Sequence, residues 1–413
     1  MDRICRRSQR FNSIEKCGFS DSDSKSQDDN AKKNIKQKSN NNKSCKVISK
    51  LLIPEDLMFD ILTFLPLRCL INSARDVCKS WATTIDNSLF AEACLHRARS
   101  KLGLYVERFD SSSSYFLDIK DDVNGQFEFE RTDLRIPRRM GRIVSSCDGI
   151  LLLRHDYRDL FVVNPILKCW LRIPPLSISE YCKFTIVRAP HTTMFKLFFI
   201  DILNVSDAFW HVFYVLRIGI DNSLKEIARK EATWDSYMLC KPLYGGGNDL
   251  YYITKKGITA VNIEKEIIVG EYPLPPVEMW YDLIQTNLWM GNHLSYIAPK
   301  SVHDHKTHTI YILDFDSGKW SLYHEMGPFD FAASCCHETI ILLALVHLLI
   351  NDQIIFQVYI RKKRDIGRDL RSIYFSYNVK TGQLKKIEDI VEESGITVWL
   401  HTNSLVSLPS TST

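Results

Sequence analysis

One short pattern recurs five times between residues 161 and 384 and constrains the fold of the chain more than any other feature. Each copy has an apolar run, a polar turn of two to four residues, and an aromatic or large aliphatic residue nine positions after the first anchor. The copies are FVVNPILKCW (161–170), VLRIGIDNSL (215–224), ITAVNIEKEI (258–267), YILDFDSGKW (311–320) and FSYNVKTGQL (375–384). Turns such as Asn164-Pro165 and Asp316-Ser317-Gly318 are typical of hairpins, so the pattern predicts a repeated antiparallel hairpin.

A second hairpin precedes several copies. Small-residue turns open another strand in CDGILLL (147–153), GGGNDLYYI (245–253) and WMGNHLSYI (289–297). Two hairpins make a four-stranded sheet, and copies starting 54, 43, 53 and 64 residues apart have the period of kelch-type propeller blades. Residues 115–130 and 396–408 supply strands for a sixth blade that joins the chain ends. We expect a propeller of about six blades, with a simple β-sandwich as the alternative.

A different pattern precedes the repeats. Pro54, followed by Glu55 and Asp56, is typical of a helix start, since proline is preorganised there and acids favour the positive dipole end. Apolar residues at helical spacing predict three short helices: one ended by Pro66, a second from Leu67 to Trp81, and a third from Asn87 to about Arg99. So small a unit makes a poor core, and a continuous apolar patch left at its surface marks a partner site. The alternative is a helical cap on the larger domain.

The residues of this helical stretch resemble the F-box motif. The resemblance rests on Ile53-Pro54-Glu55-Asp56-Leu57, Ile61-Leu62, Leu65-Pro66-Leu67-Arg68 and Arg75-x-Val77-Cys78-Lys79-x-Trp81. Ile53 stands for the usual leucine and Cys69 for the usual serine. The resemblance implies docking on the Skp adaptor of a Skp–cullin–F-box ubiquitin ligase. By position, the docking residues would be Ile53, Pro54, Leu57, Ile61, Leu62, Leu65, Pro66, Leu67 and Leu70, with Val77 and Trp81 in the packing that supports them.

The segment CDGILLL…FVVNPILKCWLRIPPL is similar to the F-box-associated, kelch-type domain that follows the F-box in many plant proteins. The double glycine of a standard kelch repeat survives only at 245–247. We therefore expect an α+β multi-domain chain, a short all-α F-box of three helices followed by an all-β kelch-like propeller of about six blades. The expected boundaries are a disordered basic tail at 1–49, the F-box at 50–97, a linker at 98–114, the propeller at 115–408 and a tail at 409–413.

Charge is unevenly spread along the chain. Residues 1–50 hold 13 Lys and Arg against 6 Asp and Glu, a net charge of +7 in a chain whose total is +4. This polar segment cannot bury enough surface to fold alone. Its lysines suggest a nuclear-import or nucleic-acid patch, and a solubilising tail is the alternative; they are Lys32, Lys33, Lys36 and Lys38.

The cysteines and the apolar runs indicate in which cellular compartment the protein resides. The 12 cysteines include no C-x-x-C pair, and the start MDRICRRSQRF lacks the apolar core of a secretory signal. We therefore expect reduced thiols and residence in the nucleus and/or cytoplasm. The longest apolar run, 340–350, is too short to span a membrane, so we interpret it as one or two buried strands and expect no membrane partner.

Recognition is expected on one face of the propeller. In an up-and-down blade the first and third turns lie on one face, and the second turns and inter-blade links on the other. The second turns at 154–159, 300–308 and 361–371 vary widely, and variable loops on a rigid scaffold carry recognition. The predicted target-binding residues are Tyr157, Arg158, Trp234, Tyr237, Trp280, Tyr281, His303, His305, Arg361 and Arg364. We interpret Trp170 and Trp320 as inter-blade core.

We expect no catalytic residue, metal or cofactor. His303, Asp304, His305 and His308 lack a nearby cysteine or acid cluster to complete a metal site. Adjacent Cys335 and Cys336 have no basic cluster to favour a thiolate. No G-x-S-x-G, H-E-x-x-H, P-loop or G-x-G-x-x-G pattern occurs. Some kelch propellers are copper oxidases, an alternative that the missing secretory signal argues against.

The sequence therefore predicts a non-catalytic substrate receptor. The F-box would hold the Skp adaptor and, through it, cullin, while the propeller captures an unidentified protein target. A propeller scaffold working outside a ligase is one alternative. A nucleic-acid binder using the basic tail is another, which the near-neutral remainder of the chain disfavours.

Overall fold

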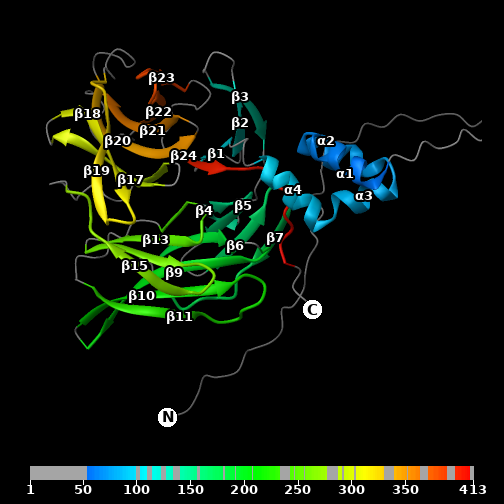
Figure 1. The fold of residues 1–413 in the computed structure, drawn as a ribbon, viewed down its shortest axis with the longest axis horizontal. Coiled ribbons are helices and arrows are strands. Elements are labelled where there is room, and N and C mark those ends of the chain that lie inside the picture. The colour runs from blue at the N-terminus through cyan, green and yellow to red at the C-terminus, as the bar shows by residue number, and fades with distance from the viewer. Residues whose placement is uncertain are drawn as a thin grey trace, which may run out of the picture.

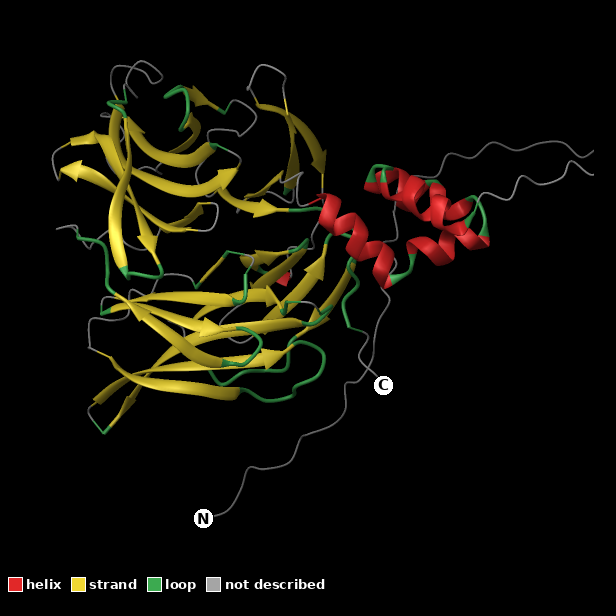
Figure 2. Ribbon diagram, viewed as in Figure 1, coloured by secondary structure: helices red, strands yellow, loops and turns green. Residues whose placement is uncertain are grey.

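In a computed structural model the chain forms a helical unit beside a ring of β-sheets (Figures 1 and 2). The structure describes the following residues: 54–98, 103–108, 114–121, 127–133, 140–155, 159–179, 182–190, 192–206, 208–232, 242–245, 247–254, 256–276, 287–290, 293–301, 304–329, 339–350, 352–362, 371–387 and 396–409. None of the helices in these ranges is both long and apolar enough to cross a membrane.

The helical unit has more helices than the three expected. It consists of α1 (Glu55–Thr63), α2 (Leu67–Asn72), a 3₁₀ turn η1 (Ala74–Asp76), α3 (Lys79–Ile85) and α4 (Ser88–Ala98). The predicted second helix is divided because the backbone leaves the helical region at Ser73 and is extended at Cys78. α4 is capped by Asn87, whose Oδ1 accepts a hydrogen bond from the backbone N–H of Leu89 at 2.8 Å.

Six four-stranded antiparallel sheets form the propeller, which confirms the predicted fold and excludes the sandwich. Blade 1 holds β4 (Arg142–Cys147), β5 (Ile150–His155), β6 (Asp159–Asn164) and β7 (Cys169–Arg172); blade 2 holds β8 (Lys183–Arg188), β9 (Phe195–Val205), β10 (Ala208–Arg217) and β11 (Lys225–Ala232); blade 3 holds β12 (Leu243–Tyr244), β13 (Asp249–Thr254), β14 (Gly257–Asn262) and β15 (Ile267–Tyr272).

The next two blades follow the same order. Blade 4 holds β16 (Asn287–Met290), β17 (His293–Ser301), β18 (Asp304–Asp314) and β19 (Lys319–Met326); blade 5 holds β20 (Thr339–Ile350), β21 (Gln353–Lys362), β22 (Arg371–Asn378) and β23 (Leu384–Lys386). Each of the five sequence copies spans the turn between the third and fourth strands of blades 1 to 5, as predicted. The apolar run 340–350 belongs to the single strand β20.

The sixth blade joins the two ends of the chain. β24 (Ile396–His401) pairs antiparallel with β1 (Gly103–Arg108), followed by β2 (Tyr115–Asp121) and β3 (Phe127–Asp133). The closure was predicted, but β1 lies in the expected linker, which is a correction. GLYVER folds as a strand because Leu104 and Val106 pack toward blade 5 while Tyr105 packs toward blade 1.

The hydrophobic core is divided among the blade interfaces. One cluster of buried side chains lies between each pair of successive blades, from blades 1 and 2 around to blades 6 and 1. Trp320 belongs to one such interface, where its Nε1–H donates to the carbonyl oxygen of Pro273 at 2.9 Å. Trp170 was expected in the core but is 39% exposed, because it lies on the edge strand β7, where its ring meets that of Phe161 edge to face.

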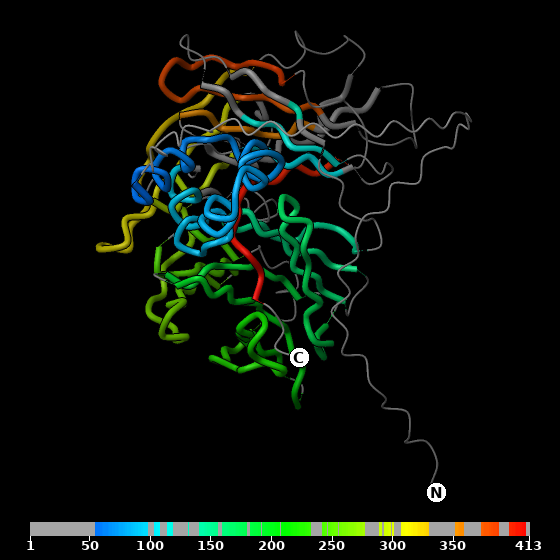
Figure 3. The backbone as a smooth tube through the Cα atoms, turned by 90° about the vertical axis from the view of Figure 1, so that its right-hand side faces the viewer, coloured from blue at the N-terminus to red at the C-terminus, as the bar shows by residue number. Residues whose placement is uncertain are grey.

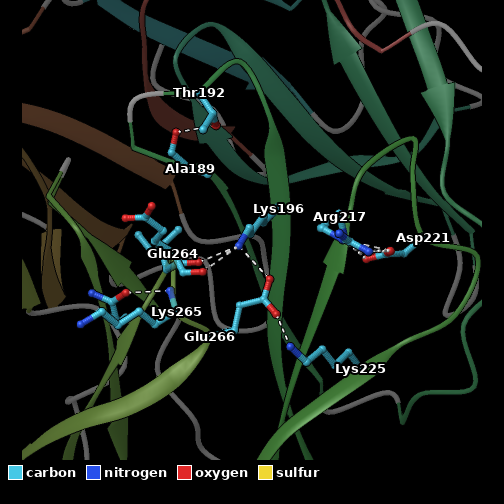
Figure 4. A network of polar contacts seen from close by, with 11 residues as sticks. Ala189, Thr192, Lys196, Arg217, Asp221, Lys225, Glu264, Lys265 and Glu266 are labelled. Carbon is cyan, nitrogen blue, oxygen red and sulfur yellow. Dashed lines mark hydrogen bonds and ion pairs between the residues drawn. The ribbon is translucent and has the colours of Figure 1, made fainter.

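An ion-pair network, in which Lys196 is buried and Lys225 is exposed, also joins blades 2 and 3 (Figure 4). The Lys196 ammonium donates to the carbonyl oxygen of Ile263 at 2.8 Å and to Oε1 of Glu266 at 2.7 Å. Lys225 donates to Oε2 of the same carboxylate at 2.6 Å. Burial alone would raise the pKa of Glu266, but the two lysine hydrogen bonds hold it below its usual value. The network therefore fixes the third turn of blade 3 to the neighbouring sheet.

Candidate functional site

One stripe of apolar side chains on α1 is left uncovered. Leu57, Ile61 and Phe64 follow one another at helical spacing and are 52%, 44% and 75% exposed. Met58 and Leu62, also four residues apart, are buried on an adjacent side of the same helix, about 100° round its axis from Leu57 and Ile61. We call the exposed stripe of Leu57, Ile61 and Phe64, with the exposed Pro54 and Pro66 at either end, the docking face.

The structure divides the predicted adaptor-binding residues into two groups. Pro54, Leu57, Ile61 and Pro66 are exposed, Leu65 and Leu67 are half-buried, and Ile53 lies outside the described residues. Leu62 and Leu70 are 0% exposed, so as contact residues they are a correction: they point into the helical core and support the face from within. Trp81 is half-buried as expected of a supporting residue, but Val77 is 60% exposed and does not pack there.

The inner side of the helical unit is covered by the chain itself. Its core gathers Met58, Leu62 and Phe90 with Leu405 from the C-terminal segment, and Ile166 and Leu167 of blade 1 pack against it. The helical core is therefore shared with the propeller and with the end of the chain.

Residues 402–409, here called the C-terminal strap and drawn in red in Figure 3, contact the helices through Leu405 and blades 1 and 2 through Val406. The side-chain amide of Asn164 donates to the carbonyl oxygens of Ser404 and Val406 at 3.0 and 2.8 Å. Gly149 has φ +81, and a Cβ there would lie 2.2 Å from the Cβ of Ser404. Only glycine fits this turn, because the strap passes directly over it.

A second contact fixes α4 to the propeller. Leu95 lies in the core between blades 1 and 2. Nearby Arg188, whose side chain is 7% exposed, contacts Oε1 of Glu92 at 3.2 Å and Oδ2 of Asp148 at 3.9 Å. A buried arginine needs such partners. Asp148 and Gly149 lie in the first turn of blade 1, and Asn164 begins its third turn. The helices and the strap therefore lie on the face of the propeller that carries the first and third turns.

The predicted target-binding face is therefore the face opposite the helices. Among its predicted residues, His305 lies in β18 and Arg361 in β21, and their side chains are not described. The expected second turn at 300–308 is much shorter, because β17 and β18 continue to Ser301 and from Asp304. The remaining residues lie outside the described part of the chain: Tyr157, Arg158, Trp234, Tyr237, Trp280, Tyr281, His303 and Arg364.

Sequence reasoning missed residues on both faces. Phe64 continues the stripe of Leu57 and Ile61, and extending the helical spacing by one turn finds it. On the opposite face, β9 and β10 have 11 and 10 residues; the exposed Val205 ends β9, and the half-buried Trp210 lies near the start of β10. The unusually long apolar run FKLFFIDILNV was the available signal for this hairpin.

Two buried ionisable groups, Cys94 and His211, have pKa values that keep them uncharged at neutral pH. Burial raises the pKa of the Cys94 thiol to about 11, so it stays protonated at neutral pH. Burial, with Lys256 and Lys230 nearby, lowers the pKa of His211 to about 4 and keeps this imidazole neutral. Within the described ranges, no three His, Cys, Asp or Glu side chains lie close enough together to hold a metal ion.

Part of the chain matches one protein family, and the chain has weak similarity to several solved structures. Residues 51–92 match the F-box domain. No curated protein matches the sequence. Among solved structures, an oligogalacturonate lyase from Vibrio parahaemolyticus is 12% identical over 70% of this chain and 79% of that chain, with a TM-score of 0.38.

Two further solved structures have similarly low sequence identities and TM-scores. The WD40 domain of SCAP from fission yeast is 9% identical over 74% of this chain and 99% of that chain, with a TM-score of 0.29. A β-fructofuranosidase from Bombyx mori is 11% identical over 60% and 62%, with a TM-score of 0.31. Likenesses this low carry no argument about activity. The match to residues 51–92 and the observed sheets together identify the chain as an F-box domain followed by a six-bladed β-propeller.

Proposed function

We propose that this protein is the substrate-recognition subunit of a Skp–cullin–F-box ubiquitin ligase in the nucleus or cytoplasm. Its F-box binds a Skp-type adaptor and, through it, cullin, while its propeller binds a protein target. The observation that carries the proposal is the docking face, which lies within the residues matched by the F-box domain and is left bare by the chain's own propeller.

Energetics favour a partner on this face. Fully burying a leucine, isoleucine or phenylalanine side chain is worth about 1.5–3 kcal/mol, and three such side chains stand in one row. A few well-packed apolar anchors supply most of the free energy of a protein interface. Contiguous exposed apolar patches on a folded protein typically mark such interfaces.

The arrangement of the two units supports a receptor without catalytic groups of its own. The helices occupy the face of the first and third turns, and in this proposal the target binds the opposite face. A subunit built in this way raises the local concentration of the target beside the ubiquitin-loaded enzyme that the complex brings.

The first test is a charge on the docking face. Ile61→Asp in the full-length chain places a carboxylate where the adaptor would exclude water, so we expect its affinity for a purified Skp-type adaptor to fall at least about 100-fold. Isothermal titration calorimetry gives the Kd. Leu322→Asp is the matched control, because Leu322 is 56% exposed on β19 of the propeller. Unchanged affinity of Ile61→Asp refutes the proposal.

A scaffold working outside a ligase remains the second candidate. Both functions require adaptor binding, so the discriminating measurement is whether cullin stays with the purified complex of adaptor and full-length chain. Retention of cullin supports the ligase subunit, and its loss supports the scaffold.

A further inference from the structure

Phe64 is the most exposed large apolar side chain in the described part of the chain, at 75%. It ends α1 in a helical conformation, and its backbone N–H donates to the carbonyl oxygen of Ile61 at 3.1 Å. Its backbone is thus held by the helix that also presents Leu57 and Ile61. The ring therefore extends the docking face by one helical turn.

Arg97 of α4 holds the Phe64 ring from one side. Its Cζ lies 3.8 Å from the ring centroid, and its Nη1 donates to Oγ1 of Thr63. The Thr63 hydroxyl in turn donates to the carbonyl oxygen of Asp60 at 2.7 Å. A guanidinium stacked on an aromatic ring is attracted by the negative charge of the ring face, and the hydrogen bonds fix the direction of the approach.

The propeller in turn fixes the helix that carries Arg97. Leu95, two residues earlier on α4, is buried in the core between blades 1 and 2, and Glu92 contacts the buried Arg188. Arg97 lies outside the F-box match, which ends at residue 92. A side chain that is ordered before binding loses less entropy when a partner covers it.

We propose that Phe64 is an anchor for the Skp-type adaptor and that Arg97 is its positioning residue. The inference rests on the proposed function, since the adaptor is the partner assigned to Leu57 and Ile61. Continuity with these two residues assigns Phe64 to the adaptor rather than to the target, which the propeller takes on its opposite face. The adaptor-binding surface thus depends on α4 beyond the residues that the F-box match covers.

The test compares four full-length single variants by surface plasmon resonance on an immobilised, purified Skp-type adaptor. Phe64→Ala raises Kd at least about tenfold, as expected for an interface anchor. Arg97→Gln raises Kd about threefold, because the ring is no longer held, and Arg97→Lys, which keeps the charge, recovers part of that loss. Leu322→Ala, at an apolar side chain that is 56% exposed on β19, leaves Kd unchanged.

The double variant separates positioning from direct contact. If Arg97 acts only through the ring, Phe64→Ala with Arg97→Gln binds no more weakly than Phe64→Ala alone. Additive losses mean that Arg97 contacts the adaptor itself, which overturns the positioning role. Unchanged thermal midpoints in circular dichroism confirm that both exposed substitutions leave the fold intact.

The outcomes also distinguish this inference from the proposed function. Unchanged binding of Phe64→Ala, together with loss of binding in Ile61→Asp, overturns the anchor and leaves the proposed function standing. Unchanged binding in both variants overturns the proposed function as well.

Discussion

Both sides of the helical unit carry large apolar side chains, but one side is covered by the rest of the chain and the other is exposed. On the inner side, Met58 and Leu62 are covered by Leu405 of the C-terminal strap and by blade 1. On the outer side, Leu57 and Ile61 are covered by nothing in the described chain. Residue type alone therefore does not determine which side stays exposed. The propeller determines it, because it covers one side and leaves the other side accessible to a partner.

The largest effect is expected when the C-terminal strap, which covers the inner side, is removed. Ending the chain after Asn403 deletes most of the strap, including the buried Leu405 and Val406, each worth about 1.5–3 kcal/mol. Asn164 also loses both acceptors of its buried side-chain amide, which costs about 1–3 kcal/mol more. We expect the free energy of unfolding in urea to fall by about 5 kcal/mol.

A shorter deletion is the control for this truncation. Ending the chain after Pro409 keeps the strap contacts, so the urea midpoint should match that of the full-length chain. Equal midpoints for both truncations would show that the strap does not stabilise the inner side.

A pair of alanine substitutions sharpens the comparison within α1. Leu62→Ala opens a cavity in the shared core and lowers the free energy of unfolding by about 2–5 kcal/mol. Leu57→Ala, at an exposed position, changes it by no more than about 0.5 kcal/mol. Urea unfolding followed by tryptophan fluorescence measures both. Similar losses for the two variants would mean that the outer side is also packed against the chain.

The smallest expected effect is a pH dependence at the point where the strap begins. His401 ends β24, its Nδ1 lies 3.2 Å from Oγ of Ser146, and the rings of Tyr105 and Phe116 meet it edge-on. Burial lowers the pKa of His401 to about 3. Below pH 6.5 the unfolded chain gains a proton that the folded chain does not, so stability falls as pH drops toward 3.

The loss from His401 amounts to about 2 kcal/mol between pH 6.5 and pH 5. His401→Gln removes this contribution, so its stability should change less steeply over that interval in urea titrations at successive pH values. His211 also has a lowered pKa and remains in both proteins as a common background. Parallel slopes for the two proteins would contradict the assignment to His401.

Features set by local sequence could be predicted, and features set by distant contacts could not. The blades follow from turns such as Asp314 to Lys319, where side-chain hydrogen bonds of Asp314 and Ser317 form the turn within a few residues. The docking residues Leu57 and Ile61 follow from helical spacing. The burial of Leu62 and Leu70 arises instead from a core that includes Leu405, far away in the sequence.

The strand β1 shows the same limit. Its six residues carry no turn signal, and their pairing depends on β24 from the other end of the chain. The exposure of Trp170 depends on the place of β7 at the outer edge of its blade, which no local pattern records. Phe64 differs from these cases. Its spacing from Leu57 and Ile61 was visible in the sequence, but the helical pattern was not extended to it.

The inner side of α1 can be covered only after the C-terminal strap has been synthesised. A ribosome releases α1 early, whereas Leu405, which covers its inner side, is among the last described residues to emerge. Until translation is complete, the helices have two apolar sides without cover, which favours capture by chaperones or premature association. A chain that stops short of the strap would present that second side permanently, and cellular quality control could recognise the incomplete product by it.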